Sequence, residues 1–186
     1  MREEKALGLN PLWVFGYASL IWDPGFPVAE RIGARLEGYE RSFCMSSIHH
    51  RGTETQPGLV LALDACPEAQ CAGLALRVAE ADAAETIAYL RARELVSSAY
   101  LERLVEITLR DGRRVTALTY VIDRDHDQYC AKLTPEEQAQ IITAATGGRG
   151  PNRDYLWNTF KALKEMNISD EKLSWLAARV TALSQS

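Results

Sequence analysis

Near its N-terminus the chain reads Leu12-Trp13-Val14-Phe15-Gly16-Tyr17-Ala18-Ser19-Leu20. The first six residues are mostly aromatic, β-branched or otherwise apolar, which is typical of a short buried strand. Small residues follow and indicate a tight loop after that strand. Successive backbone N–H groups in such a loop can converge on one anion or polarised carbonyl oxygen. An ordinary strand-to-turn transition has the same composition, so the residues alone leave both interpretations open.

Outward from this stretch, the sequence predicts a series of further strands. They are expected at residues 35–47, 58–63, 71–78, 103–109 and 115–122. We expect 58–63 and 71–78 to form a strand pair joined through residues 64–67. The last two strands flank Asp111-Gly112. Asp-Gly between apolar runs is a strong hairpin signal, because both turn positions favour positive φ.

A helix is expected over about residues 82–96, with Asp82 placed to cap it. Ile87, Leu90 and Glu94 are spaced so that all three share one helix face. A carboxylate on an apolar face is partly desolvated, which raises its pKa and makes it a better base near neutral pH. A helix-end glutamate paired with a neighbouring arginine has the same spacing, so this interpretation also stays open.

The last third of the chain is predicted to be helical. Thr134-Pro135-Glu136-Glu137 is a capping box with proline at the first helical position, and the helix should stop at Gly147-Gly148. A second helix is expected after Gly150-Pro151-Asn152, and a third is expected to be capped by Ser169. Strands, one helix, a hairpin and then helices make an α+β fold rather than a repeated βαβ fold.

Composition and charge exclude several classes of protein. The 186 residues include 21 Lys and Arg against 25 Asp and Glu, which gives a net charge of −4. Nucleic-acid binders usually present a basic stripe, and proteins held on anionic lipid present basic clusters, so neither partner is expected. Hydrophobic residues make up 47% of the chain, enough for a core that needs no metal or disulfide.

The cysteines point to a reducing compartment rather than to a metal site. Cys66 and Cys71 are separated by four residues, and no second pair completes a zinc set. With Cys44 and Cys130 they are interpreted as small, mostly buried side chains. No apolar run reaches about 18 residues, and the first residues do not resemble a signal peptide. We therefore expect a cytoplasmic protein without a metal.

Several blocks of the chain stand in an order that identifies a family. After residues 14–22 come His50-Arg51-Gly52-Thr53 with Pro57-Gly58, then Tyr89-Leu90-Arg91-Ala92-Arg93-Glu94 with Tyr100, Val115-Thr116-Ala117-Leu118, Tyr129, and Gly150-Pro151-Asn152-Arg153-Asp154-Tyr155-Leu156. Together these blocks resemble the ChaC family, the glutathione-specific γ-glutamylcyclotransferases. The family loop commonly reads Tyr-Gly-Ser-Leu, whereas this chain has Ala18 at the glycine position. If that position required positive φ, alanine would cost on the order of 1 kcal/mol.

The resemblance implies a small closed β-barrel surrounded by helices. It also implies cleavage of glutathione to 5-oxoproline and cysteinylglycine, a carbon–nitrogen lyase reaction of the amidine-lyase class, without a cofactor or metal. Glu94 is then the general acid/base. The residues implied to bind the γ-glutamyl substrate are Val14, Phe15, Gly16, Tyr17, Ala18, Ser19, Leu20, Arg41, Tyr100 and Tyr129.

Two alternatives remain at this point. A cyclotransferase for another γ-glutamyl amine would use the same base and loop, with a different pocket for the departing group. A non-catalytic module would keep the pocket alone, although retention of Glu94 argues against it. In either case we expect a flexible segment over residues 1–10 and a single γ-glutamylcyclotransferase-like domain over 11–186, with a small molecule as partner. The sequence does not fix the oligomeric state, and a monomer is compatible with it.

Overall fold

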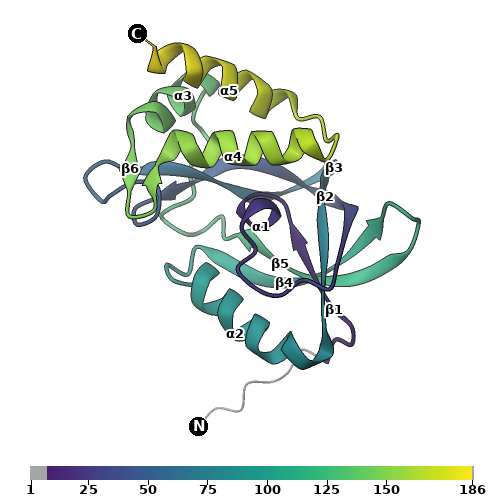
Figure 1. The fold of residues 1–186 in the computed structure, drawn as a ribbon. Coiled ribbons are helices and arrows are strands. Elements are labelled where there is room, and N and C mark those ends of the chain that lie inside the picture. The colour runs from purple at the N-terminus through teal and green to yellow at the C-terminus, as the bar shows by residue number, and fades with distance from the viewer. Residues whose placement is uncertain (1–7, 186) are drawn as a thin grey trace.

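The structure is a computed structural model that describes residues 8–185 (Figure 1). The expectation of a flexible segment over residues 1–10 therefore lies mostly outside the described residues. The strands are β1 (Leu12–Gly16), β2 (Glu30–Ser47), β3 (Gly58–Val78), β4 (Tyr100–Leu109), β5 (Arg114–Ile122), β6 (Thr146–Gly147) and β7 (Gly150–Pro151). The helices are α1 (Ser19–Trp22), the 3-10 turn η1 (Glu80–Asp82), α2 (Ala83–Glu94), α3 (Pro135–Ala144), α4 (Asn152–Glu165) and α5 (Glu171–Ser184).

Five strands form a closed barrel in the order β1-β3-β2-β4-β5. Antiparallel pairs build most of it, and a parallel contact between Val14 of β1 and Leu118 of β5 closes it. Helices α3, α4 and α5 gather on one side of the barrel and α2 lies on the other, with α1 between them (Figure 1). The predicted α+β fold, a small barrel surrounded by helices, is confirmed.

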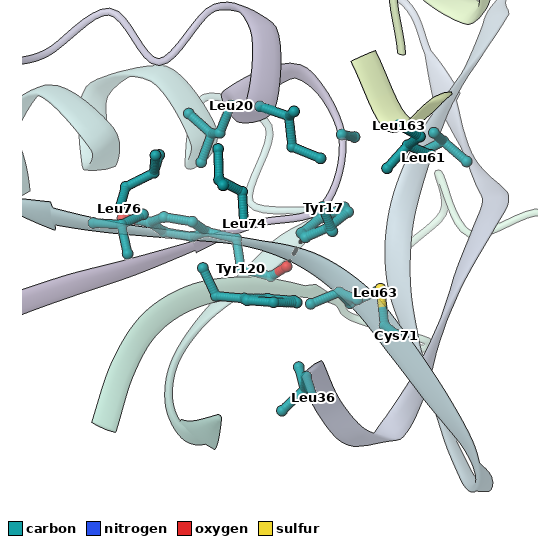
Figure 2. Close-up of a cluster of buried hydrophobic side chains, with 14 of the residues drawn as sticks. Tyr17, Leu20, Leu36, Leu61, Leu63, Cys71, Leu74, Leu76, Tyr120 and Leu163 are labelled. Atoms are coloured by element: carbon teal, nitrogen blue, oxygen red, sulfur yellow. Dashed lines mark hydrogen bonds between the residues drawn. The ribbon is translucent and has the colours of Figure 1, made fainter. Parts of the chain in front are cut away.

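The barrel interior is filled by large apolar side chains. Phe15, Leu63, Leu76 and Leu118 are almost completely buried. Figure 2 shows part of this cluster, in which the Tyr17 hydroxyl donates a hydrogen bond of 3.1 Å to the Tyr120 carbonyl oxygen. The barrel is therefore a packed core, and the loop after β1 is anchored to it at its first residue.

The expected strand pair within residues 58–78 is wrong, because this segment is one long strand, β3. Both halves pair antiparallel with β2 rather than with each other. The register jumps from Glu37 opposite Gln70 to Tyr39 opposite Ala65, so the turn signal at residues 64–67 marks a bulge. Gly38, with φ of +80°, lies opposite this bulge and allows β2 to bend there.

The β4–β5 hairpin is confirmed, with Thr108 opposite Arg114. Its turn differs from the expected one, since Gly112 has φ of +91° while Asp111 does not take a positive φ. The Leu109 N–H donates to the Arg113 carbonyl oxygen at 2.8 Å, which closes a longer loop than a two-residue turn. Longer hairpin loops commonly need positive φ at one position only.

The predicted helices are present, but two of their expected caps are wrong. Asp82 has φ of −99° and ψ of −4°, and its side chain makes no capping hydrogen bond. A capping side chain needs extended backbone to reach the first helical N–H groups, and Asp82 already belongs to the preceding 3-10 turn. Asp170 rather than Ser169 caps α5, since its carboxylate accepts from the Leu173 N–H at 3.0 Å. The capping box at Thr134 is confirmed.

The helix that begins at Pro135 ends at Ala144, before the expected stop at residues 147–148. There β6 and β7 form a small hairpin instead. The Gly148 N–H donates to the His49 carbonyl oxygen at 2.9 Å, which attaches this hairpin to the loop after β2.

The side chain of Asn152 links the start of α4 to β3 of the barrel through hydrogen bonds. This link leads to a prediction about the stability of the protein. Its Oδ1 accepts from the Leu59 N–H and its Nδ2 donates to the Leu59 carbonyl oxygen, each at 2.7 Å, and the side chain is fully buried. Asn152→Ala would leave two buried backbone groups unsatisfied, so we expect the free energy of unfolding to fall by about 2–4 kcal/mol. Urea denaturation followed by circular dichroism measures this loss. The control is Asn158→Ala on the exposed face of α4, and an equal loss in both variants would contradict the assignment.

Candidate active site

Two adjacent cavities open where the loop after β1, the end of α2 and the start of α4 meet. The inner cavity is lined by Phe15, Tyr17, Ala18, Ser19, Leu20, Leu61, Glu94, Tyr100, Thr119, Tyr120 and Tyr155. The outer cavity is lined by Ser19, Trp22, Asp23, Met45, residues 47–51, Val60, Arg93, Glu94, Val96, Ser97, Tyr100, Gln128, Arg149 and Tyr155. Ser19, Glu94, Tyr100 and Tyr155 line both cavities, so the Glu94 carboxylate lies at their junction.

Glu94 is the last residue of α2, and its side chain is only 17% exposed. Burial raises the pKa of this carboxyl group, while the positive charges of Arg93 and Arg149 lower it by less. The Arg93 Nε lies 3.1 Å from the Glu94 Oε1. The two interpretations of Glu94 from the sequence, a desolvated base and a partner of a neighbouring arginine, are therefore both correct. A carboxylate held this way suits proton transfer near neutral pH.

Four tyrosines line the inner cavity, and the hydroxyls of three of them are hydrogen-bonded to main-chain groups. The Tyr100 hydroxyl donates to the Leu61 carbonyl oxygen at 3.0 Å, and the Tyr155 hydroxyl accepts from the Leu61 N–H at 3.1 Å. Tyr17 donates to the Tyr120 carbonyl oxygen. Burial, and then the neighbouring negative charges, raise the pKa of all three hydroxyls, so they stay protonated. Apart from Glu94 itself, the lining of the inner cavity therefore carries no charged side chain.

Ala18, Ser19 and Leu20 of the loop after β1 line the inner cavity. The Ile21 N–H donates to the Ala18 carbonyl oxygen at 3.0 Å, and the Asp23 N–H donates to the Ser19 carbonyl oxygen at 2.7 Å. No acceptor within residues 8–185 is found for the N–H groups of Ser19 and Leu20. Such groups are available to an oxyanion or a carboxylate. Ala18 has φ of −143°, so the positive φ considered for this position does not occur.

Arg41 lies behind this loop rather than in either cavity. Its Nε donates to the Tyr17 carbonyl oxygen at 3.0 Å, and its Nη2 donates to the Ala72 carbonyl oxygen at 2.6 Å. The side chain is 4% exposed, and its Nε lies 3.8 Å from the Asp170 Oδ2. The guanidinium therefore fixes the backbone of the loop from the far side.

The remaining expected site residues divide between the cavity and its surroundings. Phe15, Tyr17, Ala18, Ser19, Leu20 and Tyr100 line the inner cavity together with Glu94. Val14 and Gly16 do not line it, since they pair with Leu76 and Leu74 in the barrel wall. Tyr129 lies outside both cavities, and its hydroxyl donates to the Asp64 Oδ2 at 2.8 Å.

Arg93 connects the loop to Glu94, a role that the sequence did not reveal. Its Nη2 donates to the Ser19 Oγ at 3.0 Å, and its Nη1 donates to the Asp23 carbonyl oxygen at 2.7 Å and to the Tyr89 hydroxyl at 3.1 Å. Its side chain is only 6% exposed. A buried guanidinium with this many acceptors is held in one place. Arg51, Arg149 and Tyr155 also line the site without having been predicted. Arg51 and Tyr155 each stand in one of the blocks quoted above, whereas Arg149 directly precedes the last block.

Two other features of the described residues bear on function. Within residues 8–185 no three His, Cys, Asp or Glu side chains gather as metal ligands. None of the helices described is long and apolar enough to cross a membrane.

Comparison with known proteins agrees with this geometry. A glutathione-specific gamma-glutamylcyclotransferase of Escherichia coli is 33% identical over 174 residues, which is 94% of this chain and 74% of that protein. Gamma-glutamylcyclotransferase 2-3 of Arabidopsis thaliana is 34% identical over 175 residues, 91% of this chain and 88% of its own. The crystal structure of a yeast γ-glutamylcyclotransferase specific to glutathione superposes with a TM-score of 0.84 and 25% identity, over 92% of this chain and 96% of that one. The family model described as ChaC-like protein matches residues 12–183, and the chain therefore belongs to the ChaC-like family.

Proposed function

We propose that this chain is a glutathione-specific γ-glutamylcyclotransferase that cleaves glutathione to 5-oxoproline and cysteinylglycine. The observation that supports this most directly is the desolvated Glu94 carboxylate, which lines the inner cavity together with Ala18, Ser19 and Leu20 of the loop after β1. The named activities of the Escherichia coli and yeast relatives point to the same reaction. The four free cysteine thiols suit a reducing compartment, so we propose that the reaction takes place in the cytoplasm.

The reaction needs positioning and proton transfer rather than an external nucleophile. The α-amine of the γ-glutamyl group attacks the γ-carbonyl carbon, a five-membered ring closes, and the bond to the cysteine nitrogen breaks. Holding the amine against the carbonyl converts this into a favourable intramolecular step. Glu94 takes one proton from the α-ammonium, which frees the attacking lone pair, and delivers it to the departing nitrogen. The new ring nitrogen then loses a second proton through Glu94, so that it keeps one hydrogen and the departing amine leaves as an ammonium. Atoms and protons balance without water.

The loop and the tyrosines are assigned to binding. The N–H groups of Ser19 and Leu20 hold the γ-glutamyl end of the substrate and stabilise negative charge that develops during ring closure. Arg41 is a positioning residue, because it holds the Tyr17 carbonyl oxygen and does not reach the cavity. Tyr100 contacts the substrate from the wall that both cavities share.

Arg93 gives a prediction about the pH dependence. Burial raises the pKa of Glu94 and the charge of Arg93 lowers it, so Arg93→Gln removes a stabiliser of the carboxylate. Because the reaction needs Glu94 deprotonated, the acidic limb of the kcat–pH profile should move to higher pH, by about one unit. Rates of 5-oxoproline release from pH 5 to 9 test this. Arg93→Lys, which keeps the charge, should move the limb less, and an unmoved limb in Arg93→Gln would contradict the role.

The proposed function is tested with purified protein, glutathione and γ-Glu-Cys. We expect 5-oxoproline from glutathione in the absence of any added metal or cofactor. Faster release from γ-Glu-Cys than from glutathione would shift the assignment to a different γ-glutamyl amine. Binding of glutathione without any 5-oxoproline would leave only a binding module.

A further inference from the structure

Basic side chains outnumber acidic ones in the lining of the outer cavity. His49, His50, Arg51, Arg93 and Arg149 line it, against the two carboxylates of Glu94 and Asp23. The inner cavity contains none of these five basic residues. Since the reacting γ-glutamyl group must lie against Glu94 and the inner cavity, the outer cavity receives the rest of the substrate.

The guanidinium groups of two of the three arginines already donate hydrogen bonds to other groups of the protein. The Arg51 Nη1 donates to the carbonyl oxygens of Arg149 and Pro151, at 2.8 and 3.2 Å, and its guanidinium lies over the Tyr155 ring. Arg93 is held by Ser19 and by the other acceptors described above. Burial, followed by the charge of Arg149, lowers the pKa of His50, so this imidazole is mostly neutral at neutral pH.

Arg149 differs from the other two arginines, because hydrogen bonds hold its backbone but none holds its side chain within the described residues. Its N–H donates to the His50 carbonyl oxygen at 2.9 Å, and its carbonyl oxygen accepts from Arg51. Its guanidinium forms no ion pair or hydrogen bond with any residue in the range 8–185. The preceding hairpin packs closely on the loop after β2, since a Cβ at Gly147 would lie 2.4 Å from the Gly52 nitrogen. The guanidinium therefore extends from a rigid support.

We propose that Arg149 is a specificity-determining residue that binds the C-terminal carboxylate of the departing dipeptide. This rests on the proposed function, because it takes the orientation of the substrate from the position of Glu94. A guanidinium pairs well with a carboxylate through two parallel hydrogen bonds. The C-terminal carboxylate is the charged group that cysteinylglycine adds at the far end from the reacting amide. Arg149 thereby favours peptides that end in a free carboxylate beyond the cysteine.

The test compares glutathione with its C-terminal carboxamide, which differs only in the charged group. For the parent protein we expect KM for the carboxamide to be at least ~10-fold higher, with kcat similar. Arg149→Gln should raise KM for glutathione by about the same factor and leave KM for the carboxamide unchanged. Arg149→Lys should retain part of the preference. Arg31→Gln, an exposed arginine on β2 outside both cavities, is the control with the same change of charge.

This design separates a contact with the substrate from an indirect effect. Arg149 also lowers the pKa of Glu94, and a loss of that influence would affect both substrates equally. Equal losses for glutathione and its carboxamide in Arg149→Gln, or no preference in the parent protein, would overturn the proposal.

Calorimetric titration of glutathione and its carboxamide into Glu94→Gln provides a readout that does not depend on turnover. If glutathione binds more tightly than its carboxamide, and Arg149→Gln removes this difference, the carboxylate site is supported. If the parent protein then releases no 5-oxoproline, the proposed function alone is overturned. No binding of glutathione would overturn the inference as well.

Discussion

Glu94→Gln is expected to lower kcat for 5-oxoproline release by about 10²–10⁴-fold, with a smaller change in KM. Glutamine keeps the shape of the side chain and its hydrogen-bonding capacity, but it cannot take the proton from the substrate ammonium. The loss therefore measures proton transfer rather than packing. Steady-state rates on glutathione give the effect directly.

The stability of this variant distinguishes a catalytic role from a structural one. Because burial raises the pKa of Glu94, its charged form is less stable in the folded protein than in water, and the neutral amide avoids that cost. We expect the melting temperature of Glu94→Gln at pH 7 to match or exceed that of the parent. Glu85→Gln, on the exposed part of the same helix, should leave both rate and stability unchanged. A glutamine variant with nearly full turnover would remove Glu94 from the mechanism.

Ala18→Pro is expected to lower kcat/KM for glutathione by at least ~100-fold. Proline removes the N–H of residue 18 and holds φ near −65°, whereas Ala18 has φ of −143°. Either change displaces the N–H groups of Ser19 and Leu20 that the proposal assigns to the γ-glutamyl group. The rate should fall without global unfolding, which circular dichroism verifies.

Two other substitutions at this position complete the test of the loop. Ala18→Gly should remain active, since glycine adopts the same backbone conformation. Ala18→Leu should raise KM at least as much as it lowers kcat, because Ala18 is 5% exposed and lines the inner cavity. Normal turnover by the proline variant would show that the loop is structural and that the substrate binds elsewhere.

Local patterns in the sequence predicted the features that depend on neighbours in the chain. The spacing of Ile87, Leu90 and Glu94 was enough to place a carboxylate on a buried helix face. Asp111-Gly112 was enough to place a hairpin, although not its turn geometry. These signals work because helix periodicity and turn chemistry act over a few residues.

The features that escaped prediction depend on segments brought together from far along the chain. Residues 58–63 and 71–78 form one strand because both pair with β2, a partner that their own sequence does not identify. Arg41 contacts the back of the loop, and Arg149 faces the outer cavity, only because the barrel and the β6–β7 hairpin place them there. The type of each side chain was visible in the sequence, whereas its neighbours required the closed barrel.

The walls of the two cavities are contributed by segments spread from Phe15 to Tyr155, with Glu94 between them. No contiguous half of the chain contains the whole site, so a chain still emerging from the ribosome has no complete pocket. Activity can begin only after α4 has been synthesised and has docked through Asn152 on β3. Glutathione therefore finds a complete site only once the segments from Phe15 to Tyr155 have been made and have folded together.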